Sequence, residues 1–418
     1  MKDLFLYLGL AVWCVALAPS TSARAAEPCT AIKDAKVMLP NGGSKVATVT
    51  IASGKITAVG SQPMDGCNVI AGTGQVLTPG FIETQSSLGL VEVSLEDTSN
   101  DTKMVGKHGP STPIRASFQV FEGYNPNSSL IAVARRAGIT SSILLPRGGT
   151  VSGQAAWVDL SGSTQKKAVQ SEAIAMVATV GQSSGSRATV FHRLRDFFEE
   201  ALEFEASASD WKKNRTRPFE RVRELRAVLP VLKGTMPLIV TAHRASDIER
   251  VIALAKKFSL KVVIAGGAEA WLLKDALAAE KIPVIVDPES NGPGSFDQIH
   301  GRANNAALLE AAGVPLILSS FSSHNARKLS QMAGTSVREG LPYAAALRAI
   351  TQTPAEVFGL QGLGKIEPGA VANVVLWSGD PFELGSKPNH VWIDGRATSL
   401  KSRQTFLRDR YMSLPVRR

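Results

Sequence analysis

Four side chains able to carry acid–base or metal chemistry stand at or just past the ends of short apolar runs: His243, Glu269, Asp287 and His324. Imidazole and carboxylate groups either hold a divalent cation together or move protons to and from a water molecule. The chain has six histidines and three cysteines in 418 residues, which leaves little material for a metal centre built from such ligands. We therefore take His243, Asp287 and His324 as the candidate catalytic residues and assign no cofactor to them.

A serine motif offers a second chemistry. Gly181-Gln182-Ser183-Ser184-Gly185 fits G-x-S-x-G, follows the apolar run 173–180 and precedes a helical pattern, which is the context of a nucleophile elbow. Asp287 and His324 follow Ser183 in the order of a Ser-Asp-His triad. No His-Gly-Gly segment is present to form an oxyanion hole, however, and small residues are common in such loops. A serine hydrolase that uses Ser183 is therefore a minor alternative.

The segments that carry these residues alternate between strand and helix patterns. Pro237–His243 is a short apolar run, as expected of a strand buried on both faces. A helix follows it, with Ser246 and Glu249 in the positions of a capping box. Repeated strand–helix units form a parallel sheet, so the predicted fold is an α/β (β/α)8 TIM-type barrel. The further strands are expected at 261–265, 283–287 and 315–319, and the further helices at 269–279, 304–312 and 341–351.

In such a barrel the loops after the strands surround one mouth, where the sites of this fold lie. Several polar side chains of these loops are cationic or able to form hydrogen bonds. The expected partner is therefore a small polar or anionic molecule. The residues expected to bind it are Gln85, Ser87, Arg244, Glu269, Asn325 and Arg327.

The two flanks of the barrel read as short strands and turns. Residues 46–51 lead through Ser53-Gly54 into 55–59, a pattern that predicts a hairpin. Both flanks are too short to be independent domains, so we expect them to pack together as a small composite β-sandwich. The predicted division is a signal peptide at 1–25, sandwich at 26–78, barrel at 79–363, and sandwich with a basic tail at 364–418.

Several motifs resemble one family. Val76–Thr84 resembles the segment that enters the barrel in the amidohydrolase superfamily, and Thr351–Gly359 and Gly364–Pro381 resemble its C-terminal signature. Ala242–Ile248 and Ser323–Arg327 resemble its imidazolonepropionase-like, secreted branch. The resemblance covers nearly all of the chain after the signal peptide. It implies a hydrolase that cleaves C–N bonds other than peptide bonds, in amides or cyclic amides.

The resemblance also implies a metal site from which this chain departs. Active members carry His-x-His after the first barrel strand, where this chain has Gln85-Ser86-Ser87. His243 matches the histidine of the fifth strand, but Ala265-Gly266-Gly267 stands where a sixth-strand histidine is expected. The eighth-strand aspartate is replaced by the serine-rich run 319–323, and no residue matches the bridging lysine or glutamate of the fourth strand. Zinc or another divalent metal is expected only if the site is rebuilt around His243.

The N-terminus has the pattern of an export signal. Lys2 gives a positive start, Leu4–Ala18 is apolar but too short to span a membrane, and Ala23–Ala25 offers a cleavage site. Trp13-Cys14 lacks the small residue of a lipoprotein signal, so no membrane anchor is expected. The protein should then be periplasmic or secreted. In that oxidising compartment Cys29 and Cys67 are expected to form a disulfide.

Composition sets the remaining limits. A hydrophobic content of 44% with 20% charged residues excludes a disordered chain. The formal net charge is +10, but the basic residues are spread along the chain without a nucleic-acid-binding signature. The sequence therefore predicts an amidohydrolase-like protein whose metal-dependent activity is lost or altered. The alternatives are a small-ligand-binding barrel, or a partner subunit that self-associates or stabilises an active paralogous amidohydrolase.

Overall fold

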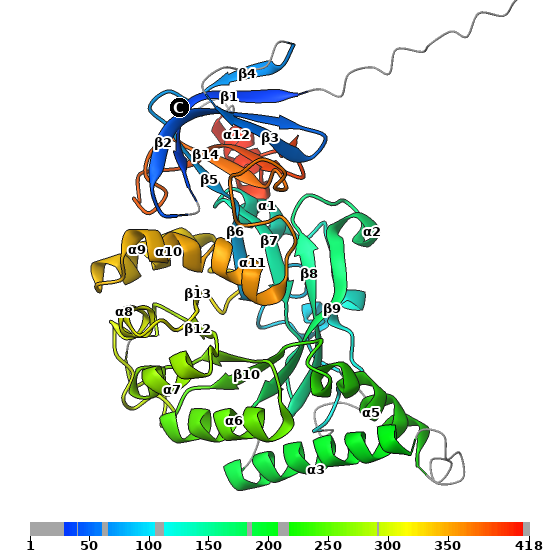
Figure 1. The fold of residues 1–418 in the computed structure, drawn as a ribbon. Coiled ribbons are helices and arrows are strands. Elements are labelled where there is room, and N and C mark those ends of the chain that lie inside the picture. Colours follow the sequence, from blue (N-terminus) through cyan, green and yellow to red (C-terminus); the bar gives the residue numbers. More distant parts are fainter. Residues whose placement is uncertain are drawn as a thin grey trace, which may run out of the picture.

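The computed structural model describes residues 29–39, 41–60, 66–104, 113–181, 186–207, 217–290 and 292–412. Within them the chain forms two eight-stranded sheets, one at the top of Figure 1 and one below it. Among the described residues, no helix combines the length and the apolar character that a membrane span requires.

The upper sheet is built from both ends of the chain. Strand β5 (Val76–Pro79) pairs antiparallel with β14 (Val374–Trp377), which joins the N-terminal flank to the C-terminal flank. The two flanks therefore pack together as expected, and the described strands form one sheet in the order β16-β15-β14-β5-β1-β2-β3, with β4 beside β1. Its other strands are β1 (Thr30–Met38), β2 (Ser44–Ala52), β3 (Lys55–Gly60), β4 (Asn68–Ala71), β15 (Pro388–Ile393) and β16 (Arg396–Ala397).

Two local features of this sheet were expected from the sequence. Strands β2 and β3 form a hairpin in which Ala52 pairs with Lys55, and the two turn residues, Ser53 and Gly54, both have positive φ. That backbone twist matches the twist of the flanking strands. Cys29, which precedes β1, is joined to Cys67, which precedes β4, by a disulfide with a Cα–Cα distance of 4.7 Å.

The lower sheet is the barrel, and it is nearly closed. Its strand order is β13-β12-β11-β10-β9-β8-β7-β6. At the seam between the first and last strands the backbone N–H of Gln85 donates to Ser319 Oγ at 3.0 Å. Ser320 N–H donates to Glu83 Oε2 at 3.2 Å. The strands are β6 (Phe81–Ser86), β7 (Ile139–Leu144), β8 (Val151–Asp159), β9 (Val169–Thr179), β10 (Leu238–Ala242), β11 (Val262–Gly266), β12 (Val284–Val286) and β13 (Leu316–Leu318).

The barrel departs from a uniform (β/α)8 arrangement at one strand. β8 runs antiparallel to both β7 and β9, whereas the other neighbouring strands are parallel. Parallel neighbours require a crossover of a dozen residues or more. The connection from β7 to β8 covers only residues 145–150, and that from β8 to β9 holds one helical turn, α2 (Gln165–Ala168). These connections are too short for a crossover, so the chain turns back on itself here.

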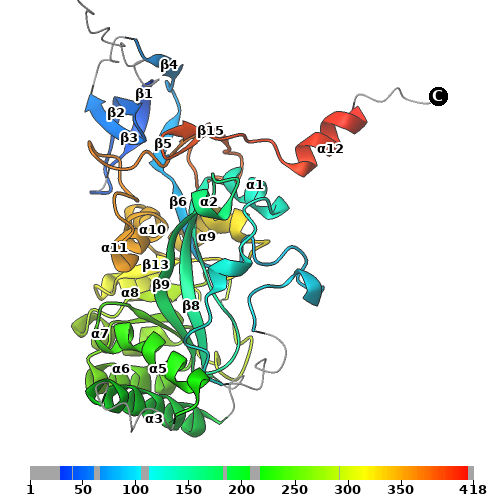
Figure 2. The same cartoon turned by 90° about the vertical axis from the view of Figure 1, so that its right-hand side faces the viewer.

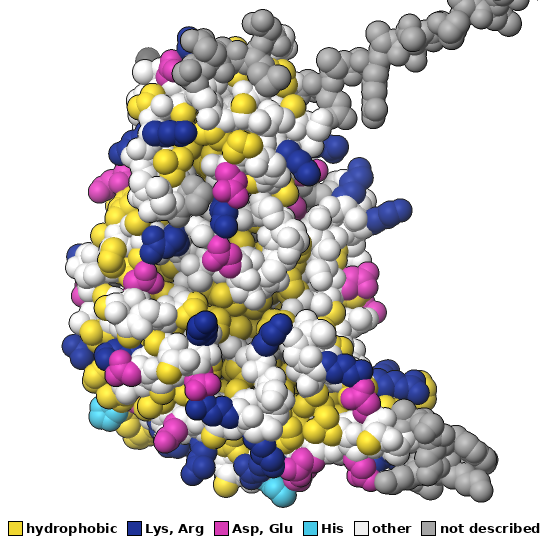
Figure 3. Space-filling view, in the orientation of Figure 1, with side chains coloured by type: hydrophobic (Ala, Val, Ile, Leu, Met, Phe, Trp, Pro, Cys, Tyr) yellow, Lys and Arg dark blue, Asp and Glu magenta, His cyan; other side chains and the backbone are white. Residues whose placement is uncertain are grey.

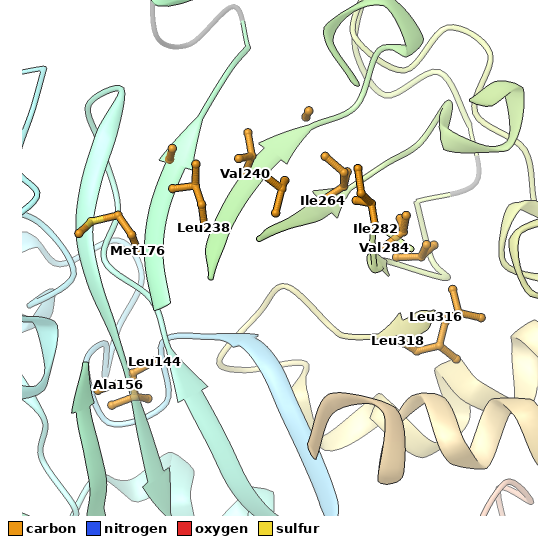
Figure 4. Packing of buried hydrophobic residues seen from close by; sticks show 14 of the residues in the cluster. Leu144, Ala156, Met176, Leu238, Val240, Ile264, Ile282, Val284, Leu316 and Leu318 are labelled. Atoms are coloured by element: carbon orange, nitrogen blue, oxygen red, sulfur yellow. The ribbon is translucent and has the colours of Figure 1, made fainter. Parts of the chain in front are cut away.

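Helices pack against the outside of the barrel strands and complete its core. Alternate strand residues such as Leu238 and Val240 belong to this outer apolar cluster (Figure 4), whereas Ile239 belongs to a second cluster with Ile143 and Ile285. The α-helices are α1 (Ser129–Arg135), α3 (Arg187–Ala206), α5 (Phe219–Leu232), α6 (Ala245–Phe258), α7 (Lys274–Ala279), α8 (Asn305–Ala311), α9 (Leu329–Arg338), α10 (Tyr343–Ala349), α11 (Gln352–Phe358) and α12 (Arg403–Met412). The 3-10 helices are η1 (Asp97–Ser99), η3 (Val120–Gly123), η5 (Ala270–Leu273) and η6 (Ala326–Lys328).

The C-terminal helix α12 stands apart from the rest of the molecule. It projects away from the upper sheet in Figure 2, and none of its residues is buried. This agrees with the basic tail expected for the end of the chain.

Candidate functional site

His243 follows β10 directly and lies against the glycine that ends β11. A Cβ placed on Gly266 would come within 2.4 Å of His243 Cε1, and the φ of Gly266 is +92°. Side chains rarely adopt such a backbone conformation, and no contact as short as 2.4 Å is tolerated. Glycine is therefore required at position 266, because the imidazole ring of His243 occupies the space that a side chain would need.

The protonation of His243 is set by its neighbours. Burial lowers the pKa of His243, and the negative charges of Asp297 and Glu269 oppose this shift. The neutral imidazole is therefore favoured. The amide nitrogen Nε2 of Gln298 lies 3.0 Å from His243 Nδ1. With the amide in this orientation its N–H donates to Nδ1, and the proton of the neutral ring is then on Nε2.

A cavity of about 170 Å³ opens beside His243, between the carboxyl ends of the strands β10 to β12 and the segment 287–306. Both charged and apolar side chains line it. Its residues are His243, Gly266, Ala268, Val286, Asp287, Pro288, Ser290, Gln298, Arg302, Ala303, Asn305, Ala306 and Phe321. The structure thus brings His243 and Asp287 together in one cavity, as the sequence predicted.

Asp287 is half-buried at the end of β12. Its Oδ1 accepts from the N–H of Glu289 at 2.9 Å. Burial raises the pKa of Asp287, and this hydrogen bond offsets part of the increase. The pKa values of His243 and Asp287 are therefore shifted in opposite directions: His243 is held neutral, and Asp287 is a stronger base than a solvated carboxylate.

Arg302, Gln298 and Phe321 line the cavity but were not predicted from the sequence. The guanidinium of Arg302 lies 4.7 Å from the ring centre of Trp271, and Trp271 Nε1 donates to the carbonyl of His300 at 2.9 Å. These contacts hold the cation at the cavity. One signal could have pointed to this segment: the long stretch between β12 and α8 follows a strand end, where loops of this fold carry their sites.

Glu269 was expected to bind substrate, but it holds two backbone segments together and does not line the cavity. It is buried, its Oε2 accepts from the N–H of Ala245 at 2.9 Å, and its Oε1 accepts from the N–H of His300 at 3.1 Å. The first bond satisfies a free N–H at the start of α6. The predicted capping box is therefore wrong: α6 begins at Ala245, and Ser246 lies inside it.

Arg244 and its neighbours form an ion-pair network beside the cavity. Arg244 Nη2 lies 3.2 Å from Asp247 Oδ1, so this cation is engaged by a carboxylate of α6. Arg187 lies 2.9 Å from Asp247 Oδ2 and also pairs with Asp297. The network ties the start of α3 and α6 to the segment that carries Gln298. Arg244 thus has a positioning role and does not line the cavity.

Gln85 and Ser87 lie at the barrel seam and do not line the cavity with His243. Both are buried, each with 5% of its surface exposed. Glu83 lies between them and β13, where it accepts hydrogen bonds from Ser319 Oγ and the N–H of Ser320. Burial raises the pKa of Glu83, and the serine hydroxyls lower it in part. These polar groups close the barrel.

The remaining predicted residues lie elsewhere. His324, Asn325 and Arg327 are exposed, and Ser323 Oγ lies 3.3 Å from His324 Nδ1. None of the three lines the cavity of His243, because the chain continues for several residues beyond β13 before it reaches them. Arg327 lines a separate hollow at the junction with the upper sheet. Ser183 lies outside the described residues.

Comparison with known proteins shows that the sequence of this chain is similar to amidohydrolases. Residues 239–398 match the model of the amidohydrolase family. Amidohydrolase tasK from Hapsidospora irregularis is 24% identical over 361 residues, which cover 78% of this chain and 36% of that protein. The chain thus spans about a third of the length of this curated relative.

Solved structures extend the comparison to the whole fold. An amidohydrolase from Thermotoga maritima MSB8 superposes with a TM-score of 0.81 at 25% identity, covering 88% of this chain and 99% of that one. An adenosine deaminase from Xanthomonas campestris with bound zinc gives a TM-score of 0.54 at 15% identity, with 93% and 100% covered. The second likeness concerns the fold alone.

Proposed function

We infer from these matches that the chain belongs to the amidohydrolase superfamily, and we propose that it binds a small polar or anionic molecule at the His243 cavity without metal-dependent hydrolysis. The observation that carries the proposal is that His243, Asp287 and Arg302 line one cavity at the carboxyl ends of the barrel strands. Sites of this fold lie at that end.

The residues present do not fit the divalent metal that members of this family usually bind. No group of three His, Cys, Asp or Glu side chains able to hold a metal ion occurs among the described residues. In the described part of the chain, His243 is the one imidazole that lines the cavity, and its Nδ1 is engaged by Gln298. Gly266 leaves no room for a second imidazole beside it. We therefore derive no catalytic step through a metal.

The cavity offers complementary groups to a small ligand. His243 Nε2–H can donate a hydrogen bond, Arg302 supplies a positive charge, and Asp287 can accept from an N–H or O–H group. Apolar side chains such as Phe321 and Val286 form the rest of the wall. A molecule with a carbonyl or carboxylate and an N–H group matches this set.

The proposal is tested by a thermal-shift screen of small amides, cyclic imides, dipeptides and carboxylates. A ligand at a hundred times its Kd should raise the unfolding free energy by about 2.7 kcal/mol, a shift of a few degrees. We expect His243→Ala and Arg302→Ala to abolish the shift, while the exposed controls His192→Ala and Arg250→Ala retain it. No shift in the wild type, or shifts unaffected by either cavity variant, would contradict the proposal.

Metal content is tested on the same material. We expect elemental analysis of the dialysed protein to find less than one equivalent of transition metal. Stoichiometric zinc that survives dialysis would contradict the loss of the metal site.

A second candidate function, hydrolysis without metal, is favoured by the opposed pKa shifts of His243 and Asp287. Such pairs often mark the acid–base assignments of an active site. Asp287 would take a proton from water as the water oxygen bonds to the amide carbon, with His243 Nε2–H hydrogen-bonded to the carbonyl oxygen. Asp287 would then pass that proton to the amide nitrogen as the C–N bond breaks, which releases the amine and leaves the carboxylic acid. We expect turnover of an amide in the presence of EDTA to be lost in Asp287→Asn while ligand binding is kept. Equal activity of this variant and the wild type would rule the mechanism out.

Export and association are further proposals. The pattern of residues 1–25 and the cysteine pair support secretion into an oxidising compartment, where the mature chain would begin at Ala26. Mass spectrometry of the protein from the periplasm or medium tests the cleavage. Self-association or pairing with a paralogous amidohydrolase is tested by light scattering of the purified protein with and without that paralogue.

A further inference from the structure

A second hollow, of about 310 Å³, lies where the barrel meets the upper sheet. It is lined by the end of α1, by η6 and the start of α9, by the residues around the ends of β14 and β15, and by the start of α12. None of its residues lines the cavity of His243. They are Val133, Arg136, Ala137, Arg327, Ser330, Gln331, Trp377, Ser386, Lys387, Pro388, Ser402 and Gln404.

Three of these residues are cations, and none of the twelve is an acid. Arg136 caps the end of α1, Arg327 belongs to η6, and Lys387 precedes β15, so the charges come from three separate elements. Among the described residues, no carboxylate lies within ion-pair distance of any of the three. Three like charges around one hollow repel each other, and a bound anion would relieve that repulsion.

The neutral groups of the hollow also suit an anion. Arg136 Nη1 donates to Ser402 Oγ at 3.4 Å, so this hydroxyl anchors the guanidinium. Ser330 and Gln331 lie in the first turn of α9, a ten-residue helix whose N-cap residue, Lys328, makes no side-chain capping bond. The first turn of a helix carries a partial positive charge and favours anions nearby.

The floor of the hollow is rigid. Trp377 is buried, its Nε1 donates to Thr78 Oγ1 at 2.9 Å, and its ring stacks on Phe81 with the centroids 5.2 Å apart. Phe81 begins the first barrel strand, whereas Trp377 ends β14 of the upper sheet. The hollow therefore sits on a fixed contact between the two sheets.

We propose that this hollow binds a small multivalent anion, such as a phosphate, a sulfate or a polycarboxylate, between Arg136, Arg327 and Lys387. The anion would bridge the barrel, which carries the two arginines, and the upper sheet, which carries the lysine. The hollow would be a second ligand site, independent of the His243 cavity. Arg327 thereby has a binding role, but for a different ligand and at a different place from the one expected.

The test is calorimetric titration of the full-length mature protein with inorganic phosphate and, separately, with citrate, at constant ionic strength set by sodium chloride. We expect saturable binding of at least one of them. Charge-assisted hydrogen bonds are the strong ones, so we expect Arg327→Ala and Lys387→Ala each to weaken binding about tenfold or more. Both side chains are exposed, so neither variant should lose its fold, which circular dichroism checks.

Three controls separate this site from general electrostatics and from the proposed function. Arg250→Ala removes an exposed arginine of α6, and we expect it to leave the titration unchanged. His243→Ala should also leave it unchanged, even where it abolishes binding at the other cavity. Arg327→Lys keeps the charge and should retain part of the affinity. No saturable binding beyond that of chloride, or equal weakening in Arg250→Ala, would overturn the proposal.

Discussion

At the candidate site the imidazole ring of His243 occupies the space that a side chain on Gly266 would need. Because a Cβ on Gly266 would lie 2.4 Å from His243 Cε1, the two positions are coupled. A side chain at 266 must push the ring away, and it must also adopt a φ of +92°. The identity of residue 266 therefore decides where the imidazole of His243 can lie.

We expect Gly266→Ala to destabilise the protein by about 2 to 4 kcal/mol, from the strained backbone and the displaced ring. Urea unfolding measures the change. Gly385→Ala is the matched control, since nothing lies within 4 Å of its added Cβ and its φ is not positive. In a His243→Ala background the cost of Gly266→Ala should fall, because the clash is gone. An equal cost in both backgrounds would show that the ring does not fill this space.

Some residues of the candidate site could be predicted from the sequence, and others could not. His243 and Asp287 could be predicted because each directly follows an apolar strand, so strand position alone fixes which end of the barrel it occupies. Arg302 lies fifteen residues beyond Asp287 in an irregular segment, and no periodicity says where such a segment folds. Arg327 and His324 were misplaced for the same reason.

At the scale of the elements, the N-terminus of α6 is capped by a residue that lies beyond the helix in the sequence, Glu269. The Glu269 carboxylate accepts one hydrogen bond from the N–H of Ala245, the first residue of α6, and one from the N–H of His300. A carboxylate that accepts two backbone bonds while buried costs more to remove than a surface charge. Glu269 therefore connects the stability of α6 to the position of Gln298 and thus to His243.

We expect Glu269→Ala to lower the unfolding free energy by about 2 to 3 kcal/mol, because two buried N–H groups lose their acceptor. Ligand binding at the His243 cavity should weaken as well, since the segment 298–302 loses its anchor. Glu249→Ala, which changes an exposed glutamate of α6, is the control and should have little effect on either quantity. If Glu269→Ala left hydrogen exchange of Ala245 and His300 unchanged, the anchoring role would be wrong.

The strands of the second half of the barrel were predictable, whereas β8 was not. The runs around β10 to β13 are short, apolar and separated by helical patterns, and the structure places each strand within one or two residues of the predicted bounds. β8 runs antiparallel because the connections to β7 and β9 are too short for a crossover. The lengths of these connections can be judged only when the bounds of β7 and β9 are known. A uniform (β/α)8 barrel has a helix after every strand, whereas the described residues between β7 and β9 hold only the single turn α2.

On the scale of the whole molecule, a buried polar chain joins the barrel to the upper sheet. Ser141 Oγ donates to Asp159 Oδ1 at 2.5 Å, and Asn373 Nδ2 lies 3.4 Å from Ser141 Oγ. Asn373 Oδ1 accepts from the N–H of Asp394 at 2.7 Å. The flanks were expected to pack together from their strand-and-turn pattern, but this contact depends on side chains that the pattern does not locate.

Asp159 makes the stability of this junction depend on pH. Burial raises the pKa of Asp159 to about 6 from its ordinary value of 3.8, and the hydrogen bond from Ser141 opposes the increase. Because the folded state holds the proton more tightly than the unfolded state, this group's contribution is fully present below pH 3.8 and is lost as the pH rises through about 6. Two pKa units correspond to about 3 kcal/mol.

We expect the unfolding free energy of the wild type to fall by about 2 kcal/mol more than that of Asp159→Asn between pH 4 and pH 7, because the asparagine has no proton to lose and most of the full contribution of Asp159 falls within this range. Comparing the two proteins at each pH cancels the contributions of other carboxylates, including Glu83 and Asp287, whose pKa values are also raised. Ser141→Ala should move the midpoint of the pH-dependent loss upward, since it removes the hydrogen bond that lowers the pKa of Asp159. Chemical denaturation of the three proteins across this range measures both effects. Parallel curves for the wild type and Asp159→Asn would mean that the carboxylate at the junction is already solvated, and the polar chain would then not control how the two sheets stay together.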